Sequence, residues 1–160
     1  MLVGGAAVEL YTGGAYKTGD FDFVGRVTDE ATRSLEEAGF RKRGRHWVHE
    51  GAQIYIELPA PSFDRPVRVD AIRMGEWTVI LLSPEDVLVD RLAAWKFWEV
   101  PVEGINSYLL YRARGSVMDR DRLEAAAAAE GVADVLDSLR QFANRTRDPE
   151  EIERWAAEVQ

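Results

Sequence analysis

The sequence pattern of the chain changes in kind at Ser83, and this change constrains the fold more than any other feature. Before Ser83, short apolar segments alternate with glycine and proline. The segment SPEDVLVDRLAAWKFW then has the marks of a helix start, with Ser83 as cap, Pro84 at the first helical position and Asp86 three residues after the cap. In most of the remaining chain, the apolar residues have the spacing of amphipathic helices. The sequence therefore predicts an α+β protein whose sheet precedes its helices.

Strands and two helices are expected before Ser83. The helix over residues 6–12 should end at the Gly13-Gly14 pair, and TDEATRSLEEAGF should form a second helix that is capped by Thr28 and ends before Gly39. Period-two or apolar stretches predict strands at residues 2–3, 20–24, 45–50, 52–58, 67–72 and 77–82. These elements predict a mixed sheet with helices, which we place in a core over residues 1–100.

The chain beyond residue 100 is expected to be a helical extension, 101–160, that packs on this core. Amphipathic spacing predicts helices at 105–114, 121–130, 132–143 and 149–159. On the helix that starts at Ser83, we expect Trp95 and Trp98 in the core, and Arg91 either packed or paired with an acid.

Composition narrows the class of protein. The chain has 160 residues, 46% apolar and 30% charged, which suits one folded domain or a compact core with an appendage. No apolar run reaches the roughly 18 residues of a membrane helix, and the amino terminus lacks the basic region of a signal peptide, so we expect a cytoplasmic protein without a membrane partner.

The net charge and the numbers of cysteines and histidines argue against further classes of protein. The net charge of −8 argues against broad nonspecific nucleic-acid binding, although RKRGRHWVH is either a local basic patch or a solvated hairpin that turns at Gly44. The chain has no cysteine, so thiolate metal sites are excluded, and with only two histidines, His46 and His49, an imidazole-rich metal site is hard to build. A hard cation held by carboxylates remains compatible with this composition.

Two aspartates supply such carboxylates. In DFDFV, strand alternation places Phe21 and Phe23 toward the core, and Asp20 and Asp22 on the other face, about 7 Å apart along the chain. Neighbouring carboxylates repel each other unless a cation or a proton intervenes. Such acids on an exposed strand are also commonly just solvated. The Gly4-Gly5 pair ahead of a helix favours a bound cation over simple solvation of the two aspartates, because glycines let a phosphate approach the N–H groups of the helix start.

These residues carry a family resemblance. GGAAVELYTGG followed by KTGDFDF resembles the first motif of the nucleotidyltransferase superfamily (the DNA polymerase beta-like fold), in which Gly-Gly or Gly-Ser precedes a helix and Thr/Ser-x-Asp-x-Asp lies on a strand. Within it, the chain is most similar to small prokaryotic minimal nucleotidyltransferases and AbiEii-type toxins, whose sheet is often followed by a segment like LLSPEDVLVDRLAAWKFW. The resemblance covers residues 3 to 100.

The resemblance implies an enzyme that uses Mg²⁺, with two ions expected, to move a nucleoside monophosphate from an NTP to a hydroxyl of RNA, protein or a small molecule. A toxin with an antitoxin protein as partner is one form of this function. The implied roles are phosphate binding by Gly4 and Gly5, metal binding by Asp20 and Asp22, and a third carboxylate, for which we prefer Glu57 over Asp70, that also serves as base.

A phosphate site also needs cations, and the chain has only three lysines. Lys17 lies just ahead of the aspartates, and Lys96 lies on the Ser83-capped helix, where similar proteins contact triphosphate with a basic residue. Both lysines can equally be ordinary surface residues. Two alternatives to the enzyme therefore remain: a catalytically silent protein of this fold that binds a nucleotide or a partner protein, and an unrelated α+β domain.

Overall fold

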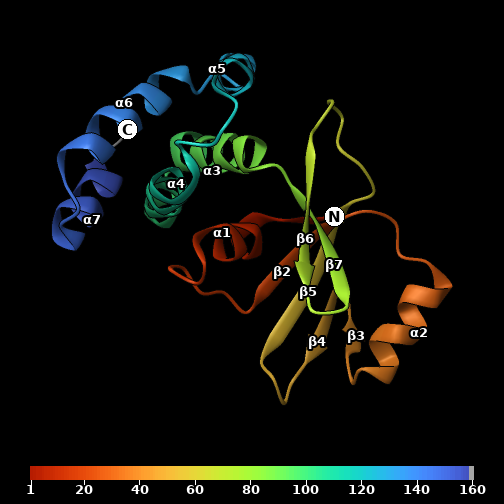
Figure 1. Ribbon diagram of the computed structural model, residues 1–160. Coiled ribbons are helices and arrows are strands. Elements are labelled where there is room, and N and C mark those ends of the chain that lie inside the picture. The colour runs from red at the N-terminus through yellow and green to blue at the C-terminus, as the bar shows by residue number, and fades with distance from the viewer. Residues whose placement is uncertain (159–160) are drawn as a thin grey trace. The chain divides into compact units, whose positions relative to one another are not determined.

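The protein divides into two compact units. Its structure, a computed structural model, describes residues 1–158 (Figure 1). The strand unit comprises Met1–Ala7 and Lys17–Ser83, and the helical unit comprises Val8–Tyr16 and the chain from Pro84 onward. The chain thus divides at the helix-start pattern and not near residue 100, and the segment before Lys17 is shared between the units.

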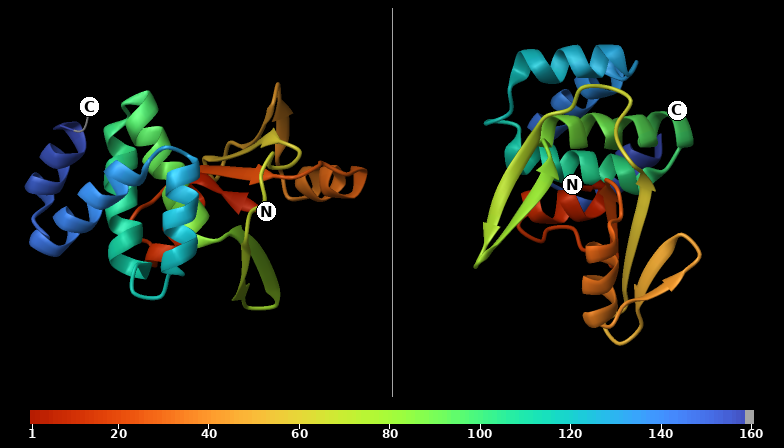
Figure 2. Two further views of the ribbon diagram at one scale, coloured as in Figure 1. Left: turned by 90° about the horizontal axis from the view of Figure 1, so that it is seen from above. Right: turned by 90° about the vertical axis from the view of Figure 1, so that its right-hand side faces the viewer.

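The strand unit contains a mixed sheet, as the sequence predicts. In residues 1–158 the sheet has seven strands in the order β3-β4-β5-β2-β1-β7-β6. Two pairs, β1 with β7 and β2 with β5, are parallel, and the others are antiparallel. The strands are β1 (Leu2–Val3), β2 (Asp20–Val24), β3 (Arg41–Arg43), β4 (His46–His49), β5 (Ile54–Ala60), β6 (Val69–Met74) and β7 (Trp77–Leu82). In Figure 2 the β6–β7 hairpin and the β3–β4 hairpin lie on opposite sides of β1 and β2.

The two faces of β2 differ in chemistry. Phe21 is paired in register with Ile56 of β5, and Ile56 with the buried Trp47 of β4, so these three apolar side chains share a face. Leu35 of α2 (Asp29–Glu37) lines a pocket with Phe23 and Ile56 on this same face. Phe21 and Phe23, expected to face the core, do lie on the apolar face of β2, but both are half-buried and not in the fully buried core.

The first two helices follow their local signals. α1 (Gly4–Thr12) starts two residues earlier than predicted and ends before Gly13 and Gly14, which both have positive φ. α2 is capped by Thr28, whose hydroxyl oxygen accepts a hydrogen bond from the Ala31 N–H at 3.1 Å. Gly39, with φ of +91°, ends the second helix.

The helical unit is built around α3 (Pro84–Trp98). Its Trp95 is fully buried, donates a hydrogen bond from Nε1 to the Ala156 carbonyl at 2.7 Å, and lies against Gly104 and Trp155. Trp95 is thus in the core, as predicted, whereas Trp98 is 76% exposed and that prediction is wrong. The other helices of this unit are α4 (Pro101–Arg114), α5 (Arg120–Ala129), α6 (Ala133–Arg145) and α7 (Pro149–Glu158).

The predicted helices of this half agree with the structure within a few residues at each boundary, except that α4 starts at Pro101 and not at residue 105. The last predicted helix ends at Val159, which lies outside the described residues. No helix in residues 1–158 has both the length and the apolar character needed to cross a membrane.

Candidate functional site

One face of the strand unit collects charged side chains in two rows that run across neighbouring strands. Residues paired in register on adjacent strands project from the same face of a sheet. One row is Arg43, His46, Glu57, Asp22 and Val3, and the other is Arg41, Val48, Tyr55 and Asp20. Seven of these residues line a cavity of about 430 Å³: Asp20, Asp22, Arg43, His46, Val48, Tyr55 and Glu57.

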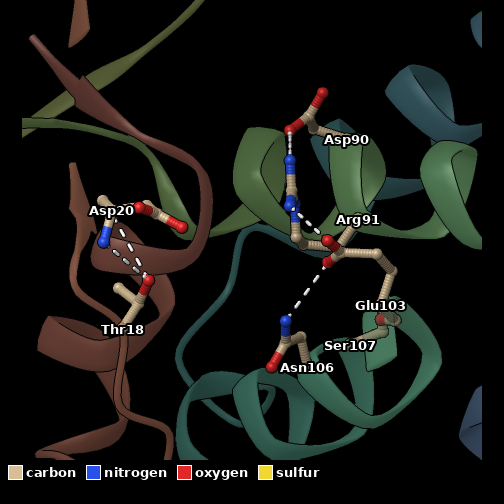
Figure 3. Close-up of polar contacts among 7 residues, drawn as sticks. All are labelled: Thr18, Asp20, Asp90, Arg91, Glu103, Asn106 and Ser107. Carbon is tan, nitrogen blue, oxygen red and sulfur yellow. Dashed lines mark hydrogen bonds and ion pairs between the residues drawn. The ribbon is translucent and has the colours of Figure 1, made fainter. Parts of the chain in front are cut away.

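The two predicted aspartates both line this cavity. The polypeptide enters β2 through Thr18, whose hydroxyl oxygen accepts a hydrogen bond from the Asp20 N–H at 3.0 Å (Figure 3). Asp20 is exposed, and Asp22 is half-buried. The strand therefore presents two carboxylates of one face to the cavity at different depths.

Gly4 lies directly against Asp22. A Cβ atom built on Gly4 would be 2.5 Å from Asp22 Oδ2, and the Gly4 backbone has φ of +66°. Both facts require glycine, because the positive φ disfavours a side chain and the carboxylate occupies its space. Gly4 is the first residue of α1, followed by Gly5, so the Asp22 carboxylate is placed where a helix start favours negative charge. The group that lies against Gly4 is thus the Asp22 carboxylate, at the helix start where phosphate binding is expected.

Glu57 is the acid that the structure brings to the aspartates. It is paired in register with Asp22 across the parallel β2–β5 ladder, and its side chain is 21% exposed. Its Oε1 is 3.0 Å from Arg45 Nε, and its Oε2 is 3.1 Å from His46 Nε2. In this arrangement Glu57 therefore balances basic groups of the β3–β4 hairpin.

Asp70 lies elsewhere in the sheet. It is on the edge strand β6, in register with Leu81, and the row continues through Leu2 to Phe23. This row belongs to the face of β2 opposite to Asp20 and Asp22. Register thus places Glu57, and not Asp70, on the same face as the two aspartates.

The two lysines considered for phosphate contact do not line this cavity. Lys17 is exposed in the connection from α1 to β2. Lys96, in the helical unit, lies 2.7 Å from Asp134 Oδ1 and donates to the Gly131 carbonyl at 2.9 Å. The hydrogen bond from Lys96 is the main cause that lowers the pKa of Asp134 below its ordinary value. Lys96 thus ties α3 to the start of α6.

A second polar cluster belongs to the helical unit. Arg91 contacts Glu103 at 2.9 Å and Asp90 at 2.6 Å, and Asn106 donates to Glu103 at 3.2 Å (Figure 3). Burial lowers the pKa of Arg91, but the charges of Asp90 and Glu103 outweigh it and raise this pKa above its ordinary value. The expectation that Arg91 packs or pairs with an acid is confirmed, and the cluster joins α3 to α4.

Sequence reasoning assigned no chemistry to three basic residues at the site: Arg43, Arg45 and His46. The RKRGRHWVH segment does form a hairpin, in which β3 and β4 turn at Gly44 with φ of +61°. A two-residue turn at Gly44-Arg45 pairs Arg43 with His46, so their common face was available from the sequence. That this face is also the face of Asp22 follows only from the pairing of β4 with β5 and of β5 with β2.

The chemistry of the donor set suits a hard divalent cation. Asp20, Asp22 and Glu57 offer only carboxylate oxygens, the ligands that Mg²⁺ prefers. Within residues 1–158, no three Asp, Glu or His side chains are close enough together to hold a metal ion as they stand. A carboxylate metal site here would therefore require side-chain rotation, above all of Glu57 away from Arg45 and His46.

Comparisons with known proteins add no assignment: no family model matches the chain, and neither the curated proteins nor the solved structures contain a match. The arguments for function therefore come from the residues and their geometry.

Proposed function

We propose that the protein is a metal-dependent nucleotidyltransferase with a nucleotidyltransferase-type fold in its strand unit, which moves a nucleoside monophosphate from an NTP to an acceptor hydroxyl. The observation that carries the proposal is the register of β2 and β5, which places Glu57 beside Asp22 on the face that also bears Asp20. Three carboxylates then line one cavity, next to a glycine-initiated helix. A cytoplasmic location would give this site both NTP and Mg²⁺.

In this proposal Asp20, Asp22 and Glu57 hold Mg²⁺, with two ions expected. Bound there, Mg²⁺ would neutralise the phosphate charge and favour in-line displacement at the α-phosphate. In this proposal phosphate oxygens approach the start of α1 beside Gly5, since the Asp22 carboxylate already lies against Gly4. In this proposal Glu57, whose side chain is 21% exposed, also accepts the proton of the acceptor hydroxyl.

Glu57 is the preferred third acid because it alone of the two candidates shares a face with the aspartates. Asp70 would have to act from the opposite face, with β1 and β7 between its strand and β2. A sheet does not let side chains of opposite faces meet at one ion.

The direct test is incubation of the purified protein with each labelled NTP, Mg²⁺ and a cell extract. Label should appear on RNA, protein or a small molecule, and Asp22→Asn should abolish it, because a metal ligand is lost. Asp64→Asn is the matched control, since Asp64 is an exposed acid in the loop between β5 and β6 and does not line the cavity. Equal labelling by Asp22→Asn and the wild type would overturn the proposal.

One form of the proposed function is a toxin whose partner is an antitoxin protein, in which transfer inactivates an acceptor that the cell needs. Expression of the wild type should then arrest growth, and Asp20→Ala should restore it at equal protein level. Arrest that persists in Asp20→Ala would count against transfer chemistry as its cause.

A second candidate function is a catalytically silent member of this fold that binds a nucleotide or a partner protein. It is favoured by the contacts of Glu57 with Arg45 and His46, and by the lack of a ready three-ligand cluster within residues 1–158. Equilibrium dialysis with labelled NTPs distinguishes the two functions. Saturable NTP binding without transfer to any component of the extract would support the silent protein.

A further inference from the structure

Each basic group that the β3–β4 hairpin brings to the cavity contacts a carboxylate. Arg43 forms an ion pair with Glu50, in the turn that follows β4. Arg45, in the turn, and His46, on β4, contact the two oxygens of Glu57 at 3.0 and 3.1 Å. One acid from β5 thus serves two basic groups, and this same acid is the proposed third metal ligand.

These ion pairs are exposed enough to be exchangeable. The side chains of Arg43 and Glu50 are 66% and 68% exposed, and that of Arg45 is 76% exposed, whereas its partner Glu57 is 21% exposed. Ion pairs in such positions contribute little net stability, because water screens them and long side chains lose freedom on pairing. A polyphosphate offers more charge and more acceptor oxygens than one carboxylate, and the arginine fork matches it well.

The cavity also needs cations from nearby. The chain carries a net charge of −8, and three acids line the cavity, so a triphosphate meets a repulsive field unless positive groups stand close to it. Arg43 lines the cavity, and Arg45 contacts Glu57, which also lines it. Neither Lys17 nor Lys96 lines it.

We propose that Arg43 and Arg45 bind the phosphate chain of the substrate, and that Glu57 exchanges partners when they do so. In the arrangement described here, Glu57 neutralises Arg45. When a triphosphate takes Arg45, Glu57 is released toward Asp22 and becomes available to a divalent cation. Because triphosphate replaces Glu57 on Arg45 and a divalent cation can then bind Glu57, phosphate binding and metal binding favour each other.

The inference rests on the proposed nucleotide site, but it makes a prediction that needs neither metal nor transfer. Glu57 should compete with phosphate in the metal-free protein. Removing its charge should therefore improve phosphate binding, although the same change removes a proposed catalytic acid.

The experiment is calorimetric titration of the metal-free protein, in EDTA and at low ionic strength, with inorganic triphosphate. Glu57→Gln should bind about fivefold more tightly than the wild type, a factor that corresponds to an exposed ion pair. Arg45→Gln should bind more weakly. Glu76→Gln, which removes an equal charge from the exposed β6–β7 turn, should match the wild type.

The double variant Glu57→Gln/Arg45→Gln separates exchange from simple repulsion. If Glu57 acts by occupying Arg45, the gain from Glu57→Gln should largely disappear when Arg45 is absent. If the full gain survives in the Arg45→Gln background, Glu57 merely repels the anion and the exchange is overturned. Arg45→Lys should recover part of the binding, which a folding defect would not explain.

Glu50→Gln provides an independent check at an exposed position. It frees Arg43 and should also tighten triphosphate binding. Unchanged binding in both Glu57→Gln and Glu50→Gln, or no binding in any variant, would overturn the inference. These outcomes are independent of the labelling assay, in which loss of the Asp22 carboxylate alone tests transfer.

Discussion

At the position of Gly4, the backbone and the Asp22 carboxylate leave no room for a side chain. The positive φ and the 2.5 Å approach to Oδ2 are two separate requirements for glycine. Gly13, at the other end of the same helix, has nearly the same φ, +65°, but nothing within 4 Å of its Cβ position. The two glycines therefore allow backbone strain to be separated from crowding at the site.

We predict that Gly4→Ala and Gly13→Ala each cost about 1 kcal/mol in free energy of unfolding through backbone strain, and that Gly4→Ala costs about 1 to 3 kcal/mol more through the clash with Asp22. Urea denaturation of both variants measures the difference. Only Gly4→Ala should also weaken Mg²⁺ binding, because it displaces a ligand. Equal effects of the two substitutions on stability and on metal binding would show that Gly4 does not position Asp22.

At the scale of elements, the sequence predicts what is local and misses what depends on pairing. DFDFV contains its own alternation, and TDEATRSLEE contains its cap, so both elements match the predictions closely. The residues of IYIEL do not by themselves indicate that β5 runs parallel to β2 with Glu57 opposite Asp22. Strand register is therefore needed to show that Glu57, and not Asp70, shares a face with the aspartates. The basic residues of the cavity could not be predicted for the same reason, because their position depends on how β4 pairs with β5.

Side-chain partners of the helices were also beyond local patterns. Lys96 and Asp134 are 38 residues apart, and their contact depends on how α3 and α6 pack. The Trp98 side chain follows the apolar spacing of α3 but belongs to the last residue of this helix, where packing no longer covers it.

The Lys96–Asp134 contact predicts a specific pH dependence. A carboxylate whose pKa is lowered in the folded protein stabilises the fold above the unfolded pKa, and this contribution is lost as pH falls through the folded pKa. The stability difference between wild type and Asp134→Asn should thus be constant near neutral pH and shrink below about pH 5.

Urea denaturation of both proteins at several pH values measures this difference. Asp121→Asn, which changes an acid in the first turn of α5 as Asp134 is in the first turn of α6, is the matched control. A difference that grows as the pH falls would contradict the assignment of Lys96 to Asp134.

At the scale of the whole molecule, the chain is made of a strand unit that bears the candidate site and a helical unit held by its own polar and aromatic contacts. The break in sequence pattern at Ser83 coincides with the division between them. The sequence predicts a boundary near residue 100 because the family resemblance includes the helix from Pro84, whereas the contacts of this helix with α4 and α5 assign it to the helical unit.

The measurement that tests the central claim most directly is Mn²⁺ binding by the full chain, followed by electron paramagnetic resonance as Mn²⁺ is titrated into the wild type, Asp22→Asn and Asp70→Asn. If the face of β2 that bears Asp20, Asp22 and Glu57 is a metal site, Asp22→Asn should lose bound Mn²⁺ and Asp70→Asn should retain it, because Asp70 lies on the opposite face. Mn²⁺ binding that is unaffected by Asp22→Asn, or is lost equally in Asp70→Asn, would contradict the account.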